Sequence, residues 1–406
     1  MRIALITARN PLAPAADRSD HPAYLARALA SQGHRVTLYA RKDGTSPQTA
    51  VLGRGVTVEQ LPAGPARELS PEQAAKHMPE MAAQLIARWK VNRPDVVHAF
   101  GWVSGLAAFG AVRDTDIPIV QTFGSLAVAE RRHGAANVCA SRMRLETLIG
   151  RKAGAVLASS GDEASDLARM AVPRPAIRVI PAGVDTDVFT PEGKCASRAS
   201  KIRLVAVTSS DEAPGLRAVL RATALVPGAE LVIAGGPGGR HLPRTGPFRE
   251  LAQLATDLKV RSRVTFAGEL APAKLAALLR SADIVISAAP YEPSGTGIIQ
   301  AMACGTPVIV SAVGAHADAV IDGTTGLLIA PDHAGMLAHR LRRLLATPAL
   351  LTAFGIAASD RARSRYSWDR IGRETAAVYE RCLPGRAAAE AAAEAEEEFE
   401  AVAVNA

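Results

Sequence analysis

The sequence predicts an α/β protein with a doubly wound parallel sheet in each half of the chain. Short, largely apolar runs alternate with amphipathic stretches, and turn residues separate the two. Such runs are typical of strands buried on both faces, and their alternation with helices indicates βαβ units. The chain has 406 residues. Because one hydrophobic core stops growing near about 250–300 residues, we expect two domains.

The first half opens with a βαβ unit, in which a helix over 23–31 joins strands over 2–8 and 35–40. Gly33 and His34 end that helix, as glycine does after many helices. A second unit has a helix over 81–89, a break at Asn92 to Pro94 and a strand over 95–99. Two more parallel strands are expected over 118–122 and 155–158.

Turn formers crowd residues 184–200, and we place the domain linker there. The first domain is expected to cover residues 1–185 and the second 186–366. In the second domain we expect strands over 203–207, 230–234, 264–266, 284–287 and 308–311, with helices over 216–224 and 248–258. A last helix is expected over 368–382, within a segment 367–386. Residues 387–406 form an Ala/Glu-rich tail with little to bury, so we expect it to be disordered.

The composition excludes several classes of protein. No apolar run reaches the roughly 18–20 residues of a membrane span, and the N-terminus lacks a secretory pattern, so we expect a cytoplasmic protein. Aromatic residues make up 4% of the chain, too few for a base-stacking surface, and we expect no nucleic-acid partner.

The charge balance leaves the kind of partner open. The net charge is +8, and the tail alone holds six glutamates, so removing these leaves +14 on the preceding residues. This surplus favours an anionic substrate or peripheral contact with a lipid surface, and compositional drift is the alternative.

No metal site is predicted. Cys139, Cys195, Cys304 and Cys382 lie far apart without a C-x-x-C pair, which indicates reduced thiols. The Asp-x-Asp triplets at 114–116 and 185–187 fit turn and capping roles better than metal binding.

The most informative stretch follows the expected strand over 284–287. A loop with Glu292 leads into a helix that begins near Gly295, Thr296 and Gly297. A helix N-terminus after a glycine loop offers free N–H groups and a positive dipole end, which suit a diphosphate. The Glu292 carboxylate can accept hydrogen bonds from sugar hydroxyls. An ordinary glycine-flanked turn is the alternative.

The chain up to about residue 382 resembles the retaining, metal-independent GT-B glycosyltransferases of family 4. It looks most similar to the group that includes the inositol-phosphate N-acetylglucosaminyltransferase of mycothiol synthesis. The resemblance lies in residues 95–99, 121–123, 180–191, 281–283, 291–310 and 322–328. It implies two Rossmann-like domains facing across a cleft, with a nucleotide-sugar held mainly by the second, an acceptor held mainly by the first and a final helix crossing back.

The resemblance also implies roles for individual residues. Glu292 would contact the donor sugar, and Gly295, Thr296, Gly297 and Gln300 would bind the rest of the donor. His98, Thr122 and Ser125 would line the acceptor side, although a buried structural role is an alternative for His98. The leaving phosphate would itself accept the acceptor's proton, and no metal or other cofactor would be required.

Five elements depart from the family pattern. Bulky and acidic residues over 18–22 replace a Gly-Gly loop, Gly124 replaces a histidine, and Phe100 replaces a second histidine after His98. Ser209 and Pro214 stand where the family has two cations for the diphosphate, and Gln300 replaces the second glutamate of a spaced pair. Arg217 and Arg240 are candidate substitute cations.

We therefore expect hexosyl transfer from a nucleotide-sugar to a small-molecule or lipid-linked acceptor, with retention of configuration. The alternative is a catalytically weak or inactive relative that serves as a protein partner or regulator.

Overall fold

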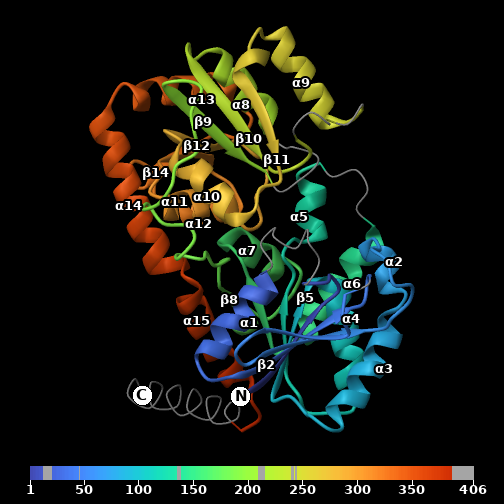
Figure 1. Ribbon diagram of the computed structural model, residues 1–406. Coiled ribbons are helices and arrows are strands. Elements are labelled where there is room, and N and C mark those ends of the chain that lie inside the picture. The colour runs from blue at the N-terminus through green and yellow to red at the C-terminus, as the bar shows by residue number, and fades with distance from the viewer. Residues whose placement is uncertain are drawn as a thin grey trace, which may run out of the picture.

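A computed structural model describes residues 1–11, 21–44, 46–134, 139–208, 215–238, 242 and 245–385. It contains two sheets, each covered by helices on both faces, with the second domain drawn above the first in Figure 1. The predicted α/β class with two doubly wound domains is confirmed.

The first sheet has the strand order β3-β4-β2-β1-β5-β6-β7-β8 among the described residues. Its strands are β1 (Arg2–Thr7), β2 (Arg35–Arg41), β3 (Thr49–Gly53), β4 (Val56–Leu61), β5 (Val96–Phe100), β6 (Ile119–Thr122), β7 (Ala155–Ala158) and β8 (Ile177–Val179). All neighbours pair in parallel except β3 and β4, which are antiparallel. The chain moves from β1 to β2 on one side and to β5 on the other, so the order reverses between β1 and β5.

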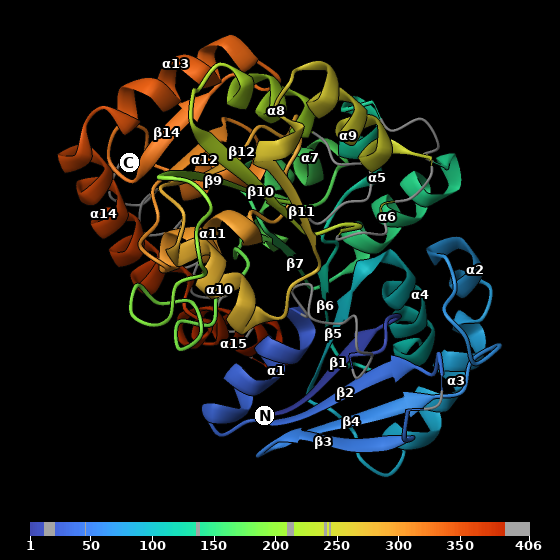
Figure 2. The ribbon, with the colours of Figure 1, turned by 45° about the horizontal axis from the view of Figure 1, so that its top comes forward.

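Helices cover both faces of this sheet. Its helices are α1 (His21–Ser31), α2 (Pro71–Ala75), α3 (Met78–Trp89), α4 (Gly101–Val112), α5 (Ala127–Arg132), α6 (Ala140–Lys152) and α7 (Gly161–Arg169). Helix α1 packs on one face, whereas α3, α4 and α6 share a buried cluster on the other (Figure 2). The central strand β5 is buried on both faces, as expected for a parallel strand in the middle of a sheet.

The second sheet has the order β11-β10-β9-β12-β13-β14 among the described residues, and all its pairs are parallel. Its strands are β9 (Ile202–Val207), β10 (Ala229–Ala234), β11 (Val264–Gly268), β12 (Ile284–Ser287), β13 (Val308–Ser311) and β14 (Gly326–Ile329). Its helices are α8 (Leu216–Ala224), α9 (Pro247–Asp257), α10 (Pro272–Arg280), α11 (Thr296–Ala303), α12 (Gly314–Ala319), α13 (Ala334–Leu345) and α14 (Pro348–Tyr366). Here the order reverses between β9 and β12.

The last helix, α15 (Trp368–Cys382), returns to the first domain. It packs against α1, and Ile371 and Tyr379 are fully buried in the same cluster as the first-domain strands. At the crossing, the Val184 N–H donates to the Tyr366 carbonyl at 2.7 Å, so the two connections between the domains run side by side. Gly183 is required there, because a Cβ would lie 2.5 Å from the Trp368 ring.

Most predicted elements lie within a few residues of the observed ones, and the differences have physical causes. The hairpin of β3 and β4 was not expected, because its edge strand has alternate exposure and lacks an apolar run. The tail over 387–406 lies outside the described residues. Within the described chain no single helix is long and apolar enough to cross a membrane; α13 and α14 meet that criterion only as a pair, bent by 102°.

Candidate functional site

The predicted donor loop lies where the second sheet reverses its strand order. The chain leaves β12 at Ser287, passes through Glu292 and enters α11, next to the carboxyl end of β9. In open parallel sheets, ligands bind in the crevice outside the strand ends at such a reversal. Gly297 brings α11 close to β9, since a Cβ there would lie 2.9 Å from Val207 Cγ1.

Glu292 stabilises the turn that leads into α11. Its Oε1 accepts hydrogen bonds from the Gly295 N–H at 3.0 Å and from the Ser294 N–H at 3.3 Å. Its Oε2 lies 3.9 Å from Nε2 of His316, a buried histidine of α12. Burial lowers the pKa of His316, and the Glu292 carboxylate acts in the opposite direction. The Glu292 side chain is 21% exposed, so one edge of the carboxylate stays open to a ligand.

The first turn of α11 retains free hydrogen-bond donors. Among the described residues, no acceptor is found for the N–H groups of Thr296 and Gly297, whereas Ile298 and Ile299 both bond the Gly295 carbonyl. Gln300 lies one turn further along the same helix and is partly exposed. The structure thus brings Glu292, Gly295, Thr296, Gly297 and Gln300 together on one loop and helix.

No candidate cation for the donor diphosphate is seen free among the described residues. Ser209, Pro214 and Arg240 lie outside the described residues, as do residues 18–20 of the altered first-domain loop. Arg217 at the start of α8 forms an ion pair with Glu250 of α9. Its guanidinium is therefore already neutralised by a neighbouring carboxylate.

On the acceptor side, His98 has the environment of a structural residue. The side chain is fully buried; Nδ1 lies 2.6 Å from the Tyr379 hydroxyl of α15, and Nε2 lies 2.9 Å from Oγ1 of Thr122. Burial and the neighbouring His21 hold the pKa of His98 well below its usual value. Both ring nitrogens of His98 therefore have partners within the protein.

Ser125 belongs to a polar network at the base of α5. Its hydroxyl lies 2.6 Å from Oε1 of Glu130, and Arg142 bonds both Glu130 and the buried Glu146. Gly124 next to it has φ of 79°, a left-handed conformation that favours glycine, and a Cβ there would meet nothing within 4 Å. The space next to Gly124 is therefore open, where the family pattern has an imidazole.

The two domains also meet at contacts that the sequence did not predict. Asp162 of α7 accepts a hydrogen bond from the Gly314 N–H of α12 at 2.8 Å, and Asp318 of α12 accepts one from the Gly161 N–H of α7 at 2.7 Å. Each helix thus receives its capping carboxylate from the other domain. Because α7 follows β7 and α12 follows β13, the carboxyl ends of the two sheets face each other.

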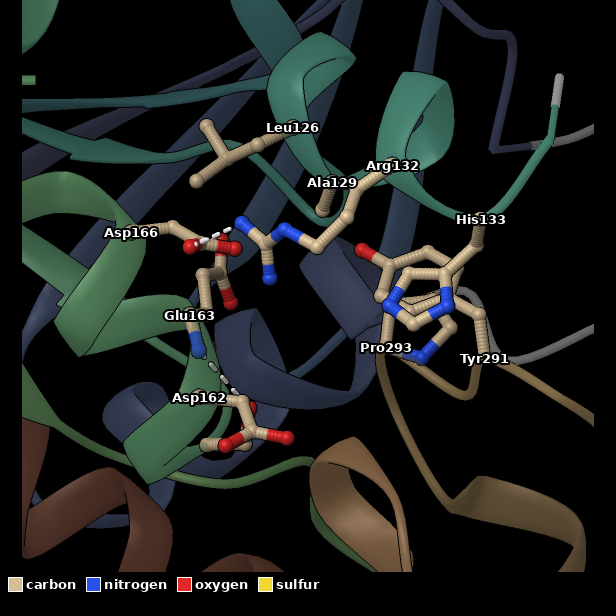
Figure 3. A pocket seen from close by; sticks show the side chains of 10 residues that line it. Leu126, Ala129, Arg132, His133, Asp162, Glu163, Asp166, Tyr291 and Pro293 are labelled. Carbon is tan, nitrogen blue, oxygen red and sulfur yellow. Dashed lines mark hydrogen bonds and ion pairs between the residues drawn. The ribbon is translucent and has the colours of Figure 1, made fainter. Parts of the chain in front are cut away.

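A narrow pocket lies beside these contacts, between α5, α7 and the donor loop (Figure 3). From the first domain, Arg132 pairs with Asp166, and Glu163 lies next to them. From the second domain, Tyr291 stacks on His133, with ring centroids 5.0 Å apart and an interplanar angle of 11°. Both residues that flank Glu292 therefore reach the first domain, since Pro293 lines the same pocket.

Only one local signal pointed toward this interface. Ser160 and Glu163 have the spacing of a capping box, and the Glu163 N–H does donate to Ser160 Oγ at 3.2 Å. Nothing in the sequence indicates that Asp162 or Asp318 reaches across to another domain. Among the described residues, no group of three His, Cys, Asp or Glu side chains could hold a metal ion.

Solved structures of glycosyltransferases share this architecture. Sucrose-phosphate synthase from Thermosynechococcus elongatus superposes with a TM-score of 0.83 at 26% identity, over 94% of this chain and 98% of that one. Anabaena HepE in complex with UDP and glucose gives a TM-score of 0.73 over 94% and 99% of the chains, and its 18% identity shows the fold alone. Two Rossmann-like domains with facing strand ends define the chain as a GT-B protein.

The sequence comparisons are more specific. Residues 20–188 match the profile described as Glycosyltransferase Family 4, and residues 196–361 match Glycosyl transferases group 1. D-inositol 3-phosphate glycosyltransferase from Mycolicibacterium paratuberculosis is 31% identical over 371 residues, 87% of this chain and 83% of that protein. The same-named protein from Mycobacterium bovis is 32% identical over 375 residues, 87% and 76% of the two chains. The chain belongs to the family-4 GT-B glycosyltransferases.

Proposed function

We propose that the chain transfers a hexosyl group from a nucleotide-sugar to an acceptor with retention of configuration. The observation that carries this proposal is the start of α11, where the N–H groups of Thr296 and Gly297 have no acceptor among the described residues and lie beside the partly exposed Glu292. Backbone N–H groups and the positive end of a helix dipole stabilise the negative charge that develops on a leaving diphosphate. The Glu292 carboxylate would accept hydrogen bonds from hydroxyls of the donor sugar.

The proton of the acceptor hydroxyl would pass to the leaving phosphate. This route needs no protein base, which agrees with His98 being buried and fully bonded. It also needs no metal ion, because the α11 N–H groups meet the diphosphate directly. A chelator such as EDTA should therefore leave transfer unchanged.

The acceptor would be a polyol or sugar, either as a small molecule or linked to a lipid. This part of the proposal is supported by the relatives from Mycolicibacterium paratuberculosis and Mycobacterium bovis, whose names give D-inositol 3-phosphate as their substrate. Inositol phosphates are therefore the first acceptors to test.

A second function is supported by the lack of free charged groups for the diphosphate among the described residues of the donor site. The Glu292 carboxylate already bonds the N–H groups of Ser294 and Gly295, and Arg217 is paired with Glu250. With Ser209 and Pro214 in place of two cations, transfer would be weak or absent, and the chain would act as a partner or regulator of another protein.

A transfer assay separates the two functions. The full chain is incubated with UDP-, GDP- and ADP-hexoses and with inositol or inositol phosphates, and the products are analysed by mass spectrometry and NMR. The first proposal predicts a glycosylated acceptor whose anomeric configuration matches that of the donor. An inverted product would contradict retention. No product with any donor, together with no donor binding, would favour the partner role.

A further inference from the structure

The loop that carries Glu292 is held by the first domain on both sides of that residue. Tyr291 packs against the first-domain core and stacks on His133. The Pro293 carbonyl accepts a hydrogen bond from the hydroxyl of Ser159, at the end of β7, at 2.6 Å. Glu292 itself turns back and accepts the N–H of Gly295, just before α11. The position of Glu292 thus depends on contacts from the opposite domain.

The two contacts of the Ser159 hydroxyl require one more proton than that hydroxyl can supply. Its Oγ lies 2.6 Å from the Pro293 oxygen and 2.5 Å from Oε2 of Glu163, which also accepts the Ser159 N–H at 2.7 Å. A hydroxyl has one proton, and a carbonyl only accepts. If Ser159 donates to Pro293, the bond to Glu163 forms only when the carboxyl is protonated and donates to Ser159. If Glu163 is ionised, Ser159 turns toward it and the Pro293 carbonyl loses its donor.

The surroundings of Glu163 favour the neutral carboxyl. The side chain is buried, and its Oε1 has no hydrogen-bond partner. Burial raises the pKa of Glu163, and the carboxylates of Asp166 and Glu146 raise it further, while the bonds from Ser159 act in the opposite direction. The other charged or titratable groups facing it are Arg132 and Glu130 from α5, Asp162 from α7, and Tyr291 and His133 across the pocket. Arg132 is already paired with Asp166.

We propose that Ser159 is a positioning residue that anchors the Glu292 loop to the first domain, and that Glu163 supplies the proton this anchor needs. This proposal rests on the function proposed above, since it concerns the loop that would hold the donor sugar. The anchor forms with neutral Glu163 and weakens as the pH rises and the carboxyl ionises. Donor binding and domain contact are thereby linked to one proton.

Capping of α7 alone does not explain the contacts of the Ser159 hydroxyl. The Ser160 and Glu163 pair caps α7, but this accounts for neither the approach of Ser159 to Pro293 nor the second short contact at the same hydroxyl. The bonds of Asp162 and Asp318 hold α7 against α12 without Ser159. Removing the Ser159 hydroxyl should therefore release the donor loop without separating the domains.

Hydrogen exchange of the donor loop tests the anchor without any substrate. Backbone exchange of residues 288–297 is measured by mass spectrometry and corrected for intrinsic rates. Because one hydrogen bond contributes about 0.5–1.5 kcal/mol, Ser159→Ala should speed exchange of this loop by roughly two- to tenfold at about pH 5.5. Ser159→Thr should restore protection. Ser165→Ala is the matched control, since that hydroxyl bonds only the Gly161 carbonyl of its own helix.

Hydrogen exchange measured as a function of pH tests whether Glu163 supplies the proton. Because burial raises the pKa of Glu163, protection of the loop should fall as the pH rises and this carboxyl ionises. In Glu163→Gln this dependence should disappear, because the amide does not titrate. A dependence that survives in Glu163→Gln would belong to another group and would overturn the role of Glu163. Equal protection in Ser159→Ala and the unmodified chain would overturn the anchor.

The exchange results are independent of whether the chain transfers sugar, so failure of the anchor and failure of the proposed function are distinguishable. If transfer is observed, Ser159→Ala should raise the KM for the donor or lower kcat while leaving the KM for the acceptor unchanged. A change confined to the acceptor KM would contradict the positioning role.

Discussion

His98 bonds two parts of the chain that lie 281 residues apart, and its protonation is linked to stability. Burial lowers the pKa of His21 to about 4 and holds that of His98 well below its usual value. Both histidines therefore bind a proton more readily in the unfolded chain. Their contribution to stability is fully present above about pH 6.5 and is lost as the pH falls toward their folded values.

We expect the free energy of unfolding to decrease below about pH 6.5, with each histidine adding a slope of about 1.4 kcal/mol per pH unit. His98→Gln keeps hydrogen-bonding groups between Thr122 and Tyr379 but does not titrate. Chemical denaturation across this range should show a shallower slope for His98→Gln. Identical slopes in the two proteins would show that His98 is not the residue responsible.

Restoring the two cations of the family pattern at positions 209 and 214 tests the donor site. A charge-assisted hydrogen bond to phosphate contributes roughly 1.5–3 kcal/mol, so two missing cations cost about 3–6 kcal/mol, or about 10²–10⁴-fold in affinity. Ser209→Arg combined with Pro214→Lys should strengthen nucleotide-diphosphate binding at least about tenfold, as measured by calorimetry. No gain would indicate that residues 18–22 or Gly124 have reshaped the site.

Helices α7 and α12 connect the two domains through a reciprocal pair of hydrogen bonds. Asp162→Ala and Asp318→Ala each remove a capping carboxylate, which typically costs about 0.5–1 kcal/mol at an exposed site. Both carboxylates hold the same pair of helices, so losing one should already loosen the other. Denaturation of the single and double variants should therefore give a combined loss smaller than the sum, by about 0.5 kcal/mol.

Asp257→Ala serves as the control for this cycle, because Asp257 is exposed and bonds only Gln253 of its own helix. It should leave the stability nearly unchanged. Strictly additive losses at Asp162 and Asp318 would mean that the two caps act independently and that α7 and α12 do not form one contact.

Elements with a strong apolar pattern could be predicted from the sequence, and contacts between elements could not. The strands around Val97 and Val285 were predicted because their residues are mostly apolar, as is typical of strands buried on both faces. The loop at Glu292 was found because a glycine-containing loop before a helix indicates an anion-binding site from the local sequence alone. The roles of Ser159 and Asp318 were missed, because each depends on a partner more than 130 residues away in sequence. His98 shows the same limit, since its partner Tyr379 reaches it only after α15 has crossed back.

On the scale of the whole molecule, the acidic tail is expected to be dispensable for folding. Alanine and glutamate supply little apolar area to offset the entropy of ordering a backbone. A chain that ends at Arg386 should keep the melting temperature of the full-length protein in differential scanning calorimetry. A decrease of more than a few degrees would show that the tail docks, and the basic body of the protein would be the expected surface.

The central claim is that a nucleotide-sugar binds at the start of α11 through Glu292. Its most direct test is a calorimetric titration of the full chain with UDP-, GDP- and ADP-hexoses, repeated with Glu292→Gln and with Glu374→Gln as a matched control, since Glu374 pairs with Arg370 of its own helix α15. Glutamine can still accept the Gly295 N–H, so the melting temperature of Glu292→Gln should change little. The account predicts that one donor binds with a Kd on the order of millimolar, more weakly to Glu292→Gln and equally to Glu374→Gln. Absence of binding to any donor, or equal binding to Glu292→Gln, would contradict it.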